Sequence, residues 1–191
     1  MTQSQMTVQQ ALELAQKHHA AGNLQQAESI YRQILSIQPK NADALHLFGV
    51  VALQVGQNEE AIRLINRAIA INPKNADYLC NLGLALMAAN RTPEAIGPFQ
   101  QALAIKSDIP EAYSNLGNAL RIVGRFDEAI AACRRAMALR PNLARAATAW
   151  AVVSPVAAAP RRSMASSLAM QCQSSSIVCS AATLFIETSS F

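Results

Sequence analysis

The sequence is poor in aromatic and in charged residues. Aromatic side chains make up only 5% of the 191 residues and charged side chains 15%, whereas 51% of the chain is hydrophobic. Much of the hydrophobic half is alanine, which is the best helix former but is too small to fill a core alone. The composition therefore predicts helices that pack closely, with few large side chains between them.

Signals of a membrane or secreted protein are also missing. No stretch reaches the roughly 18 uninterrupted apolar residues of a membrane span, and the N-terminus lacks the basic start and apolar run of a signal peptide. The four cysteines show no C-x-x-C spacing and no regular framework, which is typical of reduced thiols. We therefore expect a cytoplasmic protein with no membrane partner.

The net charge of +4 says little about partners. Residues 1–143 hold 13 Lys and Arg against 11 Asp and Glu, and the positive charges are spread along the chain. A nucleic-acid binder gathers its positive charge into a stripe that neutralises several phosphates. We find no such stripe and expect no nucleic-acid partner.

Patterns for catalysis and metal binding are absent as well. The three histidines are His18, His19 and His46, and no carboxylate accompanies them at metal-ligand spacing. We predict that they are surface histidines, and we expect neither a metal nor another cofactor. No nucleophile motif such as G-x-S-x-G occurs, so we predict no catalysis by this chain.

What the sequence does contain is a 34-residue period. Pro39 and Pro73 are 34 residues apart, and Pro141 follows after twice that distance. A fixed period of this length is the signature of stacked structural repeats. Three further series keep the same register: Gly49, Gly83 and Gly117; Ala27, Ala61, Ala95 and Ala129; and Gly22, Gly56, Asn90 and Gly124. We divide the chain into repeats 8–41, 42–75, 76–109 and 110–143.

Each repeat reads as two helices joined by a short turn, because apolar residues recur at helical spacing on both sides of the turn position. Asn90 takes the place of the turn glycine, and asparagine tolerates the left-handed conformation that such a turn requires. Thr92 followed by Pro93 predicts a side-chain cap at a helix start, and Asp108 opens the fourth repeat in a similar way. Pro98 falls inside a helix and predicts a kink or a shifted start.

Small residues are predicted to let neighbouring backbones approach closely. Glycine recurs in the first helix of three repeats, directly after the larger Phe48, Leu82 or Leu116, which fills the space between repeats. A leucine at Gly83 is therefore expected to destabilise the fold by about 1–3 kcal/mol through overpacking.

These landmarks resemble the tetratricopeptide repeat: a large residue followed by glycine in the first helix (helix A), an early alanine in the second (helix B), and a closing proline. The resemblance covers residues 8–143. It implies an all-α fold, a right-handed α-solenoid of stacked antiparallel helix pairs, with helix A of each repeat lining a concave groove. It also implies a polypeptide ligand. The first repeat lacks the helix A glycine, as an atypical terminal repeat does.

In the family, certain positions of helix A face the groove. The resemblance carries this role to Asp43, His46, Val50, Asp77, Asn81, Leu84, Glu111, Asn115, Asn118 and Arg121. Asn81 and Asn115 each precede Leu-Gly and resemble the asparagine ladder of glycosyltransferase repeats, whose amides can bond the backbone of an extended peptide. The alternative is that both asparagines are solvated helix residues.

A narrower resemblance gives a second hypothesis for function. Residues 43–78 and 113–141 look like the repeats that precede the catalytic domain of bacterial proteins related to O-linked N-acetylglucosamine transferases and that recruit their polypeptide substrates. The first hypothesis is a non-catalytic scaffold that binds a protein or peptide in its groove. The second is the substrate-recruiting part of such a transferase, since the 48 residues after 143 are too few for a catalytic domain. Weak self-association through terminal repeats is a third expectation.

The ends of the chain depart from the period. Residues 1–7 precede the first repeat as an N-terminal extension. Trp150 continues the register of Leu116, so residues 144–153 are predicted to form a capping helix. The Ser- and Ala-rich residues 154–191 are predicted to be mostly disordered. Another hypothesis is that this tail comes from a truncated or frame-shifted continuation of a longer repeat protein.

Overall fold

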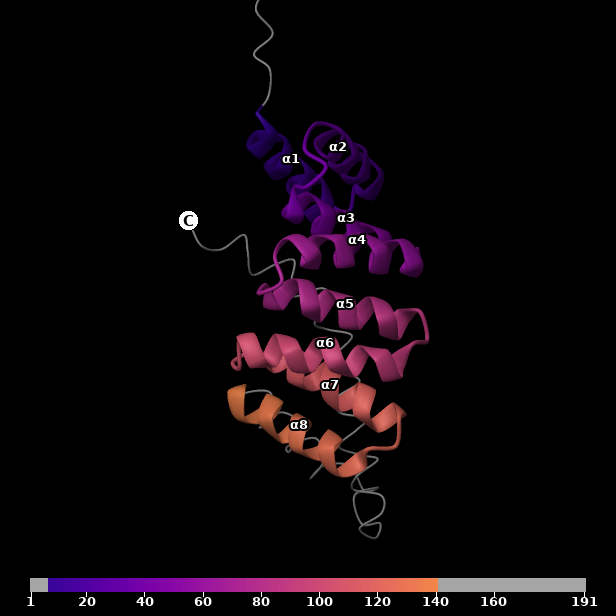
Figure 1. Cartoon of the computed structure of the whole chain (residues 1–191), viewed down its shortest axis with the longest axis vertical. Coiled ribbons are helices and arrows are strands. Elements are labelled where there is room, and N and C mark those ends of the chain that lie inside the picture. Colours follow the sequence, from indigo (N-terminus) through magenta and orange to yellow (C-terminus); the bar gives the residue numbers. More distant parts are fainter. Residues whose placement is uncertain (1–6, 141–191) are drawn as a thin grey trace, which may run out of the picture. The chain divides into compact units, whose positions relative to one another are not determined.

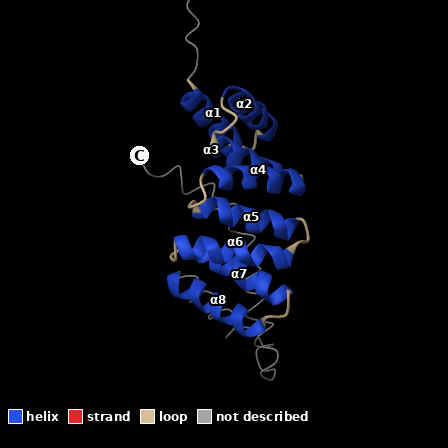
Figure 2. Ribbon diagram, viewed as in Figure 1, coloured by secondary structure: helices blue, strands red, loops and turns tan. Residues whose placement is uncertain are grey.

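The computed structural model describes residues 7–140, and every regular element within them is an α-helix. Figure 2 shows these helices joined by short loops. Their bounds are α1 Val8–Ala20, α2 Leu24–Ile37, α3 Ala42–Gln54, α4 Asn58–Ile71, α5 Ala76–Ala88, α6 Thr92–Ile105, α7 Pro110–Ile122 and α8 Phe126–Leu139. The predicted all-α fold class is confirmed.

The helices belong to two compact units that divide after Asn90. The N-terminal unit contains α1–α5, and in it each helix packs against the next one along the chain (Figure 1). Helix α3 also contacts both α1 and α5. The C-terminal unit contains α6–α8, in which α7 packs against both α6 and α8. Odd-numbered helices correspond to helix A of the predicted repeats and even-numbered helices to helix B.

The turn between helix A and helix B has the predicted left-handed residue. Gly22, Gly56 and Gly124 have φ angles of 76°, 80° and 81°, and Asn90 has φ 60°. A side chain with a Cβ rarely adopts this conformation, apart from asparagine and aspartate. The substitution of Asn90 for glycine is therefore compatible with the same turn.

The A helices α1, α3 and α5 begin with a side-chain cap, whereas the B helices do not. Thr7 forms a capping box with Gln10 at the start of α1, and the side chains of Asn41 and Asn75 cap α3 and α5. The even-numbered helices have no side-chain cap. The prediction that Thr92 caps its helix is wrong, because the capping position is Arg91 and Thr92 is the first helical residue.

Two other sequence predictions about helix starts need correction. Helix α7 has Pro110 in its first turn, as expected, but its capping position is Ile109 and Asp108 makes no cap. Pro98 lies inside α6, yet the helix runs without interruption from Thr92 to Ile105. Pro98 therefore does not shift the start of this helix.

The predicted close approach of small residues is found in both units. Gly49 in α3 lies so close to α4 that a Cβ placed on it would be 2.7 Å from Ile65 Cγ1. Gly117 in α7 lies equally close to α8, with Cys133 Sγ 2.7 Å from the same virtual atom. Gly83 is buried in α5. Gly49 and Gly117 allow the two helices of their pairs to approach where a Cβ would collide.

Some predictions concern residues that lie outside 7–140. These are the capping helix at 144–153 and the disordered tail at 154–191. The division into four repeats with an extension and a tail stays a prediction. Among the described helices, none is long and apolar enough to cross a membrane.

Candidate functional site: the helix A face

Three side-chain hydrogen bonds join the A helices of the N-terminal unit, and each connects residues 35 positions apart. His19 in α1 pairs with Gln54 in α3. Asp43 and His46 in α3 pair with partners in α5, which are Tyr78 and Asn81 respectively. A step of 34 residues reaches the same position in the next repeat, so a step of 35 reaches the following residue. The polar side chains of this face thus satisfy one another across neighbouring helices.

His46 is a buried ionisable group of this face, with 9% of its surface exposed. Asn81 Nδ2 donates a hydrogen bond to His46 Nε2 at 2.7 Å, so the imidazole is neutral and carries its proton on Nδ1. The Tyr78 ring lies 4.4 Å from the His46 ring, measured between centroids. Burial lowers the pKa of His46 to about 4, although Asp43 opposes this shift; His19 lowers it further.

His19 and Tyr78 complete the set of ionisable partners. His19 Nε2 donates to Gln54 Oε1 at 3.0 Å, and burial lowers the pKa of His19 despite this bond. The hydroxyl of Tyr78 donates to the carboxylate of Asp43, and burial together with Asp43 raises the pKa of Tyr78. The prediction that the histidines lie on the surface is therefore wrong for His19 and His46.

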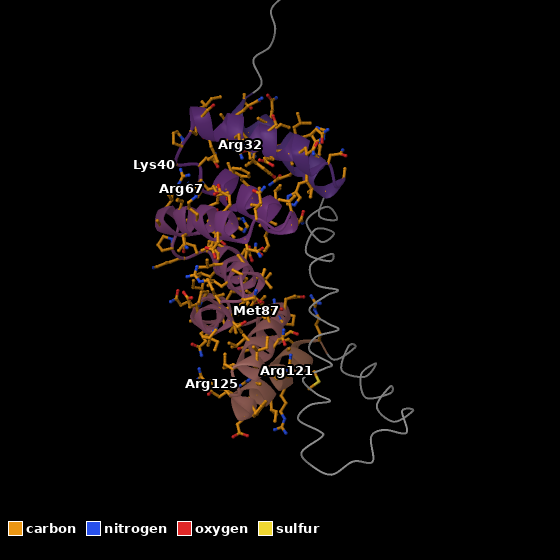
Figure 3. All side chains as sticks on the ribbon, turned by 90° about the vertical axis from the view of Figure 1, so that its right-hand side faces the viewer. Arg32, Lys40, Arg67, Met87, Arg121 and Arg125 are labelled. Atoms are coloured by element: carbon orange, nitrogen blue, oxygen red, sulfur yellow. The ribbon has the colours of Figure 1, made fainter. Side chains whose placement is uncertain are left out.

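Apolar side chains lie between these polar pairs and are only partly covered. Val50 and Leu84, both predicted from the sequence, are half-buried. Leu53 is half-buried as well, and so is Met87, which is labelled in Figure 3. Half-buried aliphatic side chains next to satisfied polar groups offer apolar contact area to a ligand. Asp77, at the start of α5, is exposed.

One cysteine of the described residues lies on the helix A face. Cys80 in α5 is a free thiol, as expected. Burial raises the pKa of the Cys80 thiol to about 12, and Asp77 adds to this. The thiolate is the nucleophilic form, so this cysteine is chemically inert at neutral pH.

The C-terminal unit carries the remaining predicted residues on α7. Asn115 and Asn118 are buried, with 5% and 8% of their surfaces exposed. Asn118 Oδ1 accepts a hydrogen bond from Arg121 Nη2 at 3.0 Å, and Glu111 forms an ion pair with Arg140. The Nε of Arg121 is buried and has no hydrogen-bond partner among the described residues.

These contacts bear on the two interpretations of the asparagines. Neither is a solvated helix residue, because Asn115 is buried and Asn81 is half-buried and bonded to His46. Asn81 still has a second amide hydrogen and its carbonyl oxygen available. The groove positions predicted from the sequence do not include three of the bonded partners, which are Tyr78, His19 and Gln54. Polar residues that recur 35 positions apart were the signal that could have identified them.

Within residues 7–140, no group of three or more His, Cys, Asp or Glu side chains is arranged to hold a metal ion.

Three family models match the chain, and all three describe the tetratricopeptide repeat. They match residues 18–82, 75–107 and 110–143, and together they extend over most of the described helices. The chain is a tetratricopeptide-repeat protein. No curated protein matches it in sequence.

Solved structures of other tetratricopeptide proteins have a similar fold. The MamA protein is 21% identical with a TM-score of 0.69, and the match covers 86% of this chain and 89% of MamA. YrrB, described as a TPR protein with an unusual peptide-binding site, is 20% identical with a TM-score of 0.68, over 89% and 88% of the two chains. At these identities the likeness concerns the fold alone.

A third similar structure is an O-GlcNAc transferase from Thermobaculum terrenum. It is 30% identical with a TM-score of 0.62, and the match covers 71% of this chain. The same match covers 27% of the transferase. The similarity therefore extends over about a quarter of that enzyme.

Proposed function

We propose that this tetratricopeptide protein is a non-catalytic scaffold, and that the helix A face of its N-terminal unit binds a polypeptide partner. The observation that carries the proposal is the mixture of half-buried apolar side chains and internally satisfied polar groups on α3 and α5. A ligand on this face would cover apolar surface next to polar groups that already have hydrogen-bond partners. The cost of desolvating unpaired polar groups is therefore reduced.

The arrangement favours a ligand that contributes apolar side chains. Val50 and Leu84 occupy the same position in successive repeats, as do Leu53 and Met87. A peptide that follows the repeats therefore meets aliphatic side chains at regular intervals. Asn81 donates one amide hydrogen to His46 and retains one hydrogen and its carbonyl oxygen for a peptide backbone. The peptide-binding description of YrrB supports a ligand of this class.

The second candidate function is substrate recruitment for a glycosyltransferase. It rests on the 30% identity to the Thermobaculum terrenum O-GlcNAc transferase over 71% of this chain. Sequencing the gene beyond the codon for residue 191 tests it. A downstream transferase domain in the same or a shifted reading frame supports this function, and its absence leaves the scaffold as the function.

The scaffold proposal predicts that Leu84→Asp abolishes peptide binding. A random peptide display library selected on the immobilised full chain supplies the probe, and fluorescence polarisation measures its affinity. We expect Leu84→Asp to weaken binding by about tenfold or more, because it places a charge within the covered apolar surface. Asn66→Asp is the matched control, since Asn66 is exposed on α4 and the added charge is the same. Equal losses in both variants would contradict the proposal.

The double variant Asn81→Ala with Asn115→Ala tests the asparagine ladder separately. A ladder that bonds the peptide backbone predicts that this variant loses binding to every selected peptide. If the affinity of the selected peptides stays unchanged, the ladder plays no part in binding. Circular dichroism of the variant controls for folding, because both asparagines take part in contacts within the chain.

A further inference from the structure

We propose that a second surface of the N-terminal unit, where helix B ends, binds an acidic and partly apolar segment of a partner protein. This surface, which we call the basic edge, lies at the ends of α2 and α4 and in the loops that follow them. It consists of two exposed isoleucines and three exposed cations: Ile37, Lys40, Arg67, Ile71 and Lys74. The proposal is independent of the helix A face and does not use its residues.

A hydrogen bond between helix and loop joins the α4 part of the basic edge to the loop that follows α2. Arg67 Nη2 in α4 donates to the carbonyl oxygen of Pro39 at 3.3 Å, and Pro39 lies between Ile37 and Lys40 in sequence. Figure 3 shows Lys40 and Arg67 close together on one side of this unit. Ile71 follows Arg67 by one helical turn, so both lie on the same side of α4.

The two isoleucines of the basic edge expose a large part of their apolar surface to water. Ile37 has 71% of its surface accessible and Ile71 has 43%. Single exposed aliphatic residues are ordinary on protein surfaces. Here the same position is exposed in two successive repeats, and the cations surround it. An apolar patch with a charged rim is typical of an interaction surface.

The cations of the basic edge are not neutralised within the described residues. The other two arginines of this unit form ion pairs with glutamates of their own helices, whereas Arg67 contacts a carbonyl oxygen. No ion pair in residues 7–140 involves Lys40 or Lys74. In the sequence, the first carboxylate after Lys40 is that of Asp43, and the first after Lys74 is that of Asp77. Asp43 accepts a hydrogen bond from the hydroxyl of Tyr78. The basic edge therefore presents three positive charges that attract a negative partner.

Acidic protein fits this combination better than the other polyanions. Nucleic acid is bound mainly through its phosphates, which make no use of two exposed isoleucines. Recruitment to an anionic membrane usually takes a cluster of about four to eight lysines and arginines, which is more than this edge contains. A peptide with carboxylates beside leucine, isoleucine or phenylalanine complements both the charge and the apolar surface.

Fluorescence polarisation with the full chain tests this inference. The probe is a labelled helical peptide composed of Glu, Leu and Ala, and its counterpart has Lys in place of every Glu. We expect the acidic peptide to bind and the basic one not to bind. Lys40→Glu combined with Arg67→Glu should weaken binding of the acidic peptide by about tenfold or more and reduce its salt dependence. Ile37→Ser with Ile71→Ser should weaken it by a similar factor while the salt dependence stays unchanged.

Control variants decide whether the surface is specific. Lys17→Glu with Arg134→Glu makes the same change in net charge at exposed residues elsewhere and should alter the affinity by less than about twofold. An equal loss in this control would overturn the proposal, because general charge attraction would explain the binding.

The identity of the ligand is tested with two other polyanions. Stronger binding to phosphatidylserine vesicles or to single-stranded oligothymidine, lost in the Lys40 and Arg67 variant, would overturn the assignment to a protein partner. Leu84→Asp should leave acidic peptide binding intact, so failure of one surface is distinguishable from failure of the other.

Discussion

The free energy of unfolding of the whole chain is expected to fall by about 3 kcal/mol from pH 7 to pH 4 through His46 alone. The pKa of His46 is lowered from 6.5 to about 4 in the fold, because the ring is buried. Between these pH values the unfolded chain binds more protons than the folded chain. The stability contribution is therefore complete above pH 6.5 and is lost as the pH falls toward 4. His19, whose pKa is also lowered, adds to the loss.

The molecular reason is the hydrogen bond between Asn81 and His46. Protonation of His46 turns its Nε2 into a donor that faces the amide donor of Asn81, and it places a charge beside the Tyr78 ring. Asp43 is the neighbouring group that favours the protonated ring of His46. The carboxylate of Asp43 is partly engaged already, because it accepts a hydrogen bond from the hydroxyl of Tyr78. Desolvation is the largest of these effects on the pKa.

Urea unfolding followed by circular dichroism at several pH values measures the effect, and two histidine variants isolate it. His46→Gln retains an acceptor for Asn81 but cannot be protonated. The fall in its free energy of unfolding from pH 7 to pH 4 should therefore be about 3 kcal/mol smaller than that of the unmodified chain. His18→Gln removes a histidine that forms none of the three hydrogen bonds and should keep the pH dependence of the unmodified chain. An unchanged pH dependence in His46→Gln would contradict the assignment.

Replacing glycine with alanine should have opposite effects at two helical positions. Gly49→Ala is expected to destabilise the fold by about 1–3 kcal/mol, because the new Cβ would lie 2.7 Å from Ile65 Cγ1 and 3.3 Å from the carbonyl oxygen of Ala61. Gly97→Ala in α6 meets nothing within 4 Å. It should stabilise the fold by about 0.5–1 kcal/mol, because alanine loses less backbone entropy than glycine in a helix.

Thermal and urea unfolding of both alanine variants give the two changes directly. The chemical substitution is identical, so the difference in sign reports only the space around each glycine. Gly117→Ala should resemble Gly49→Ala, since Cys133 Sγ lies 2.7 Å from its added Cβ. If Gly49→Ala were as stable as the parent chain, the close packing of α3 on α4 would not be rigid.

The fold could be predicted from the sequence because one period fixes several kinds of residue at once. Left-handed turn residues, small contact residues and closing prolines all repeat at 34 positions, and the turn at Asn90 follows the same rule. The cap at Thr92 was predicted wrongly because local sequence favoured it. The turn residue at position 90 sets the start of the helix, which leaves Arg91 as the capping position. Register within the repeat thus dominates over the local capping preference.

The candidate site was less predictable, because its bonds form between helices. His46 alone reads as a polar residue on a helix, and nothing in its own helical pattern reveals that α5 covers it. The helix A positions predicted from the family resemblance include both partners of the bond between His46 and Asn81. They include only one partner of the bond between Asp43 and Tyr78. Which side chains meet depends on how the helices of neighbouring repeats are placed against each other. The sequence pattern of a single repeat does not specify this placement.

The 35-residue step of these hydrogen bonds has a consequence for how such a chain can evolve. Each bonded pair has one member in one repeat and the other in the next, as with His19 and Gln54 or His46 and Asn81. A deletion or shuffling of the second repeat, residues 42–75, separates the partners at both of its borders and leaves buried polar groups without a match. Modules with equal backbones are therefore not interchangeable in this protein. Their order along the gene is constrained by which side chains must meet.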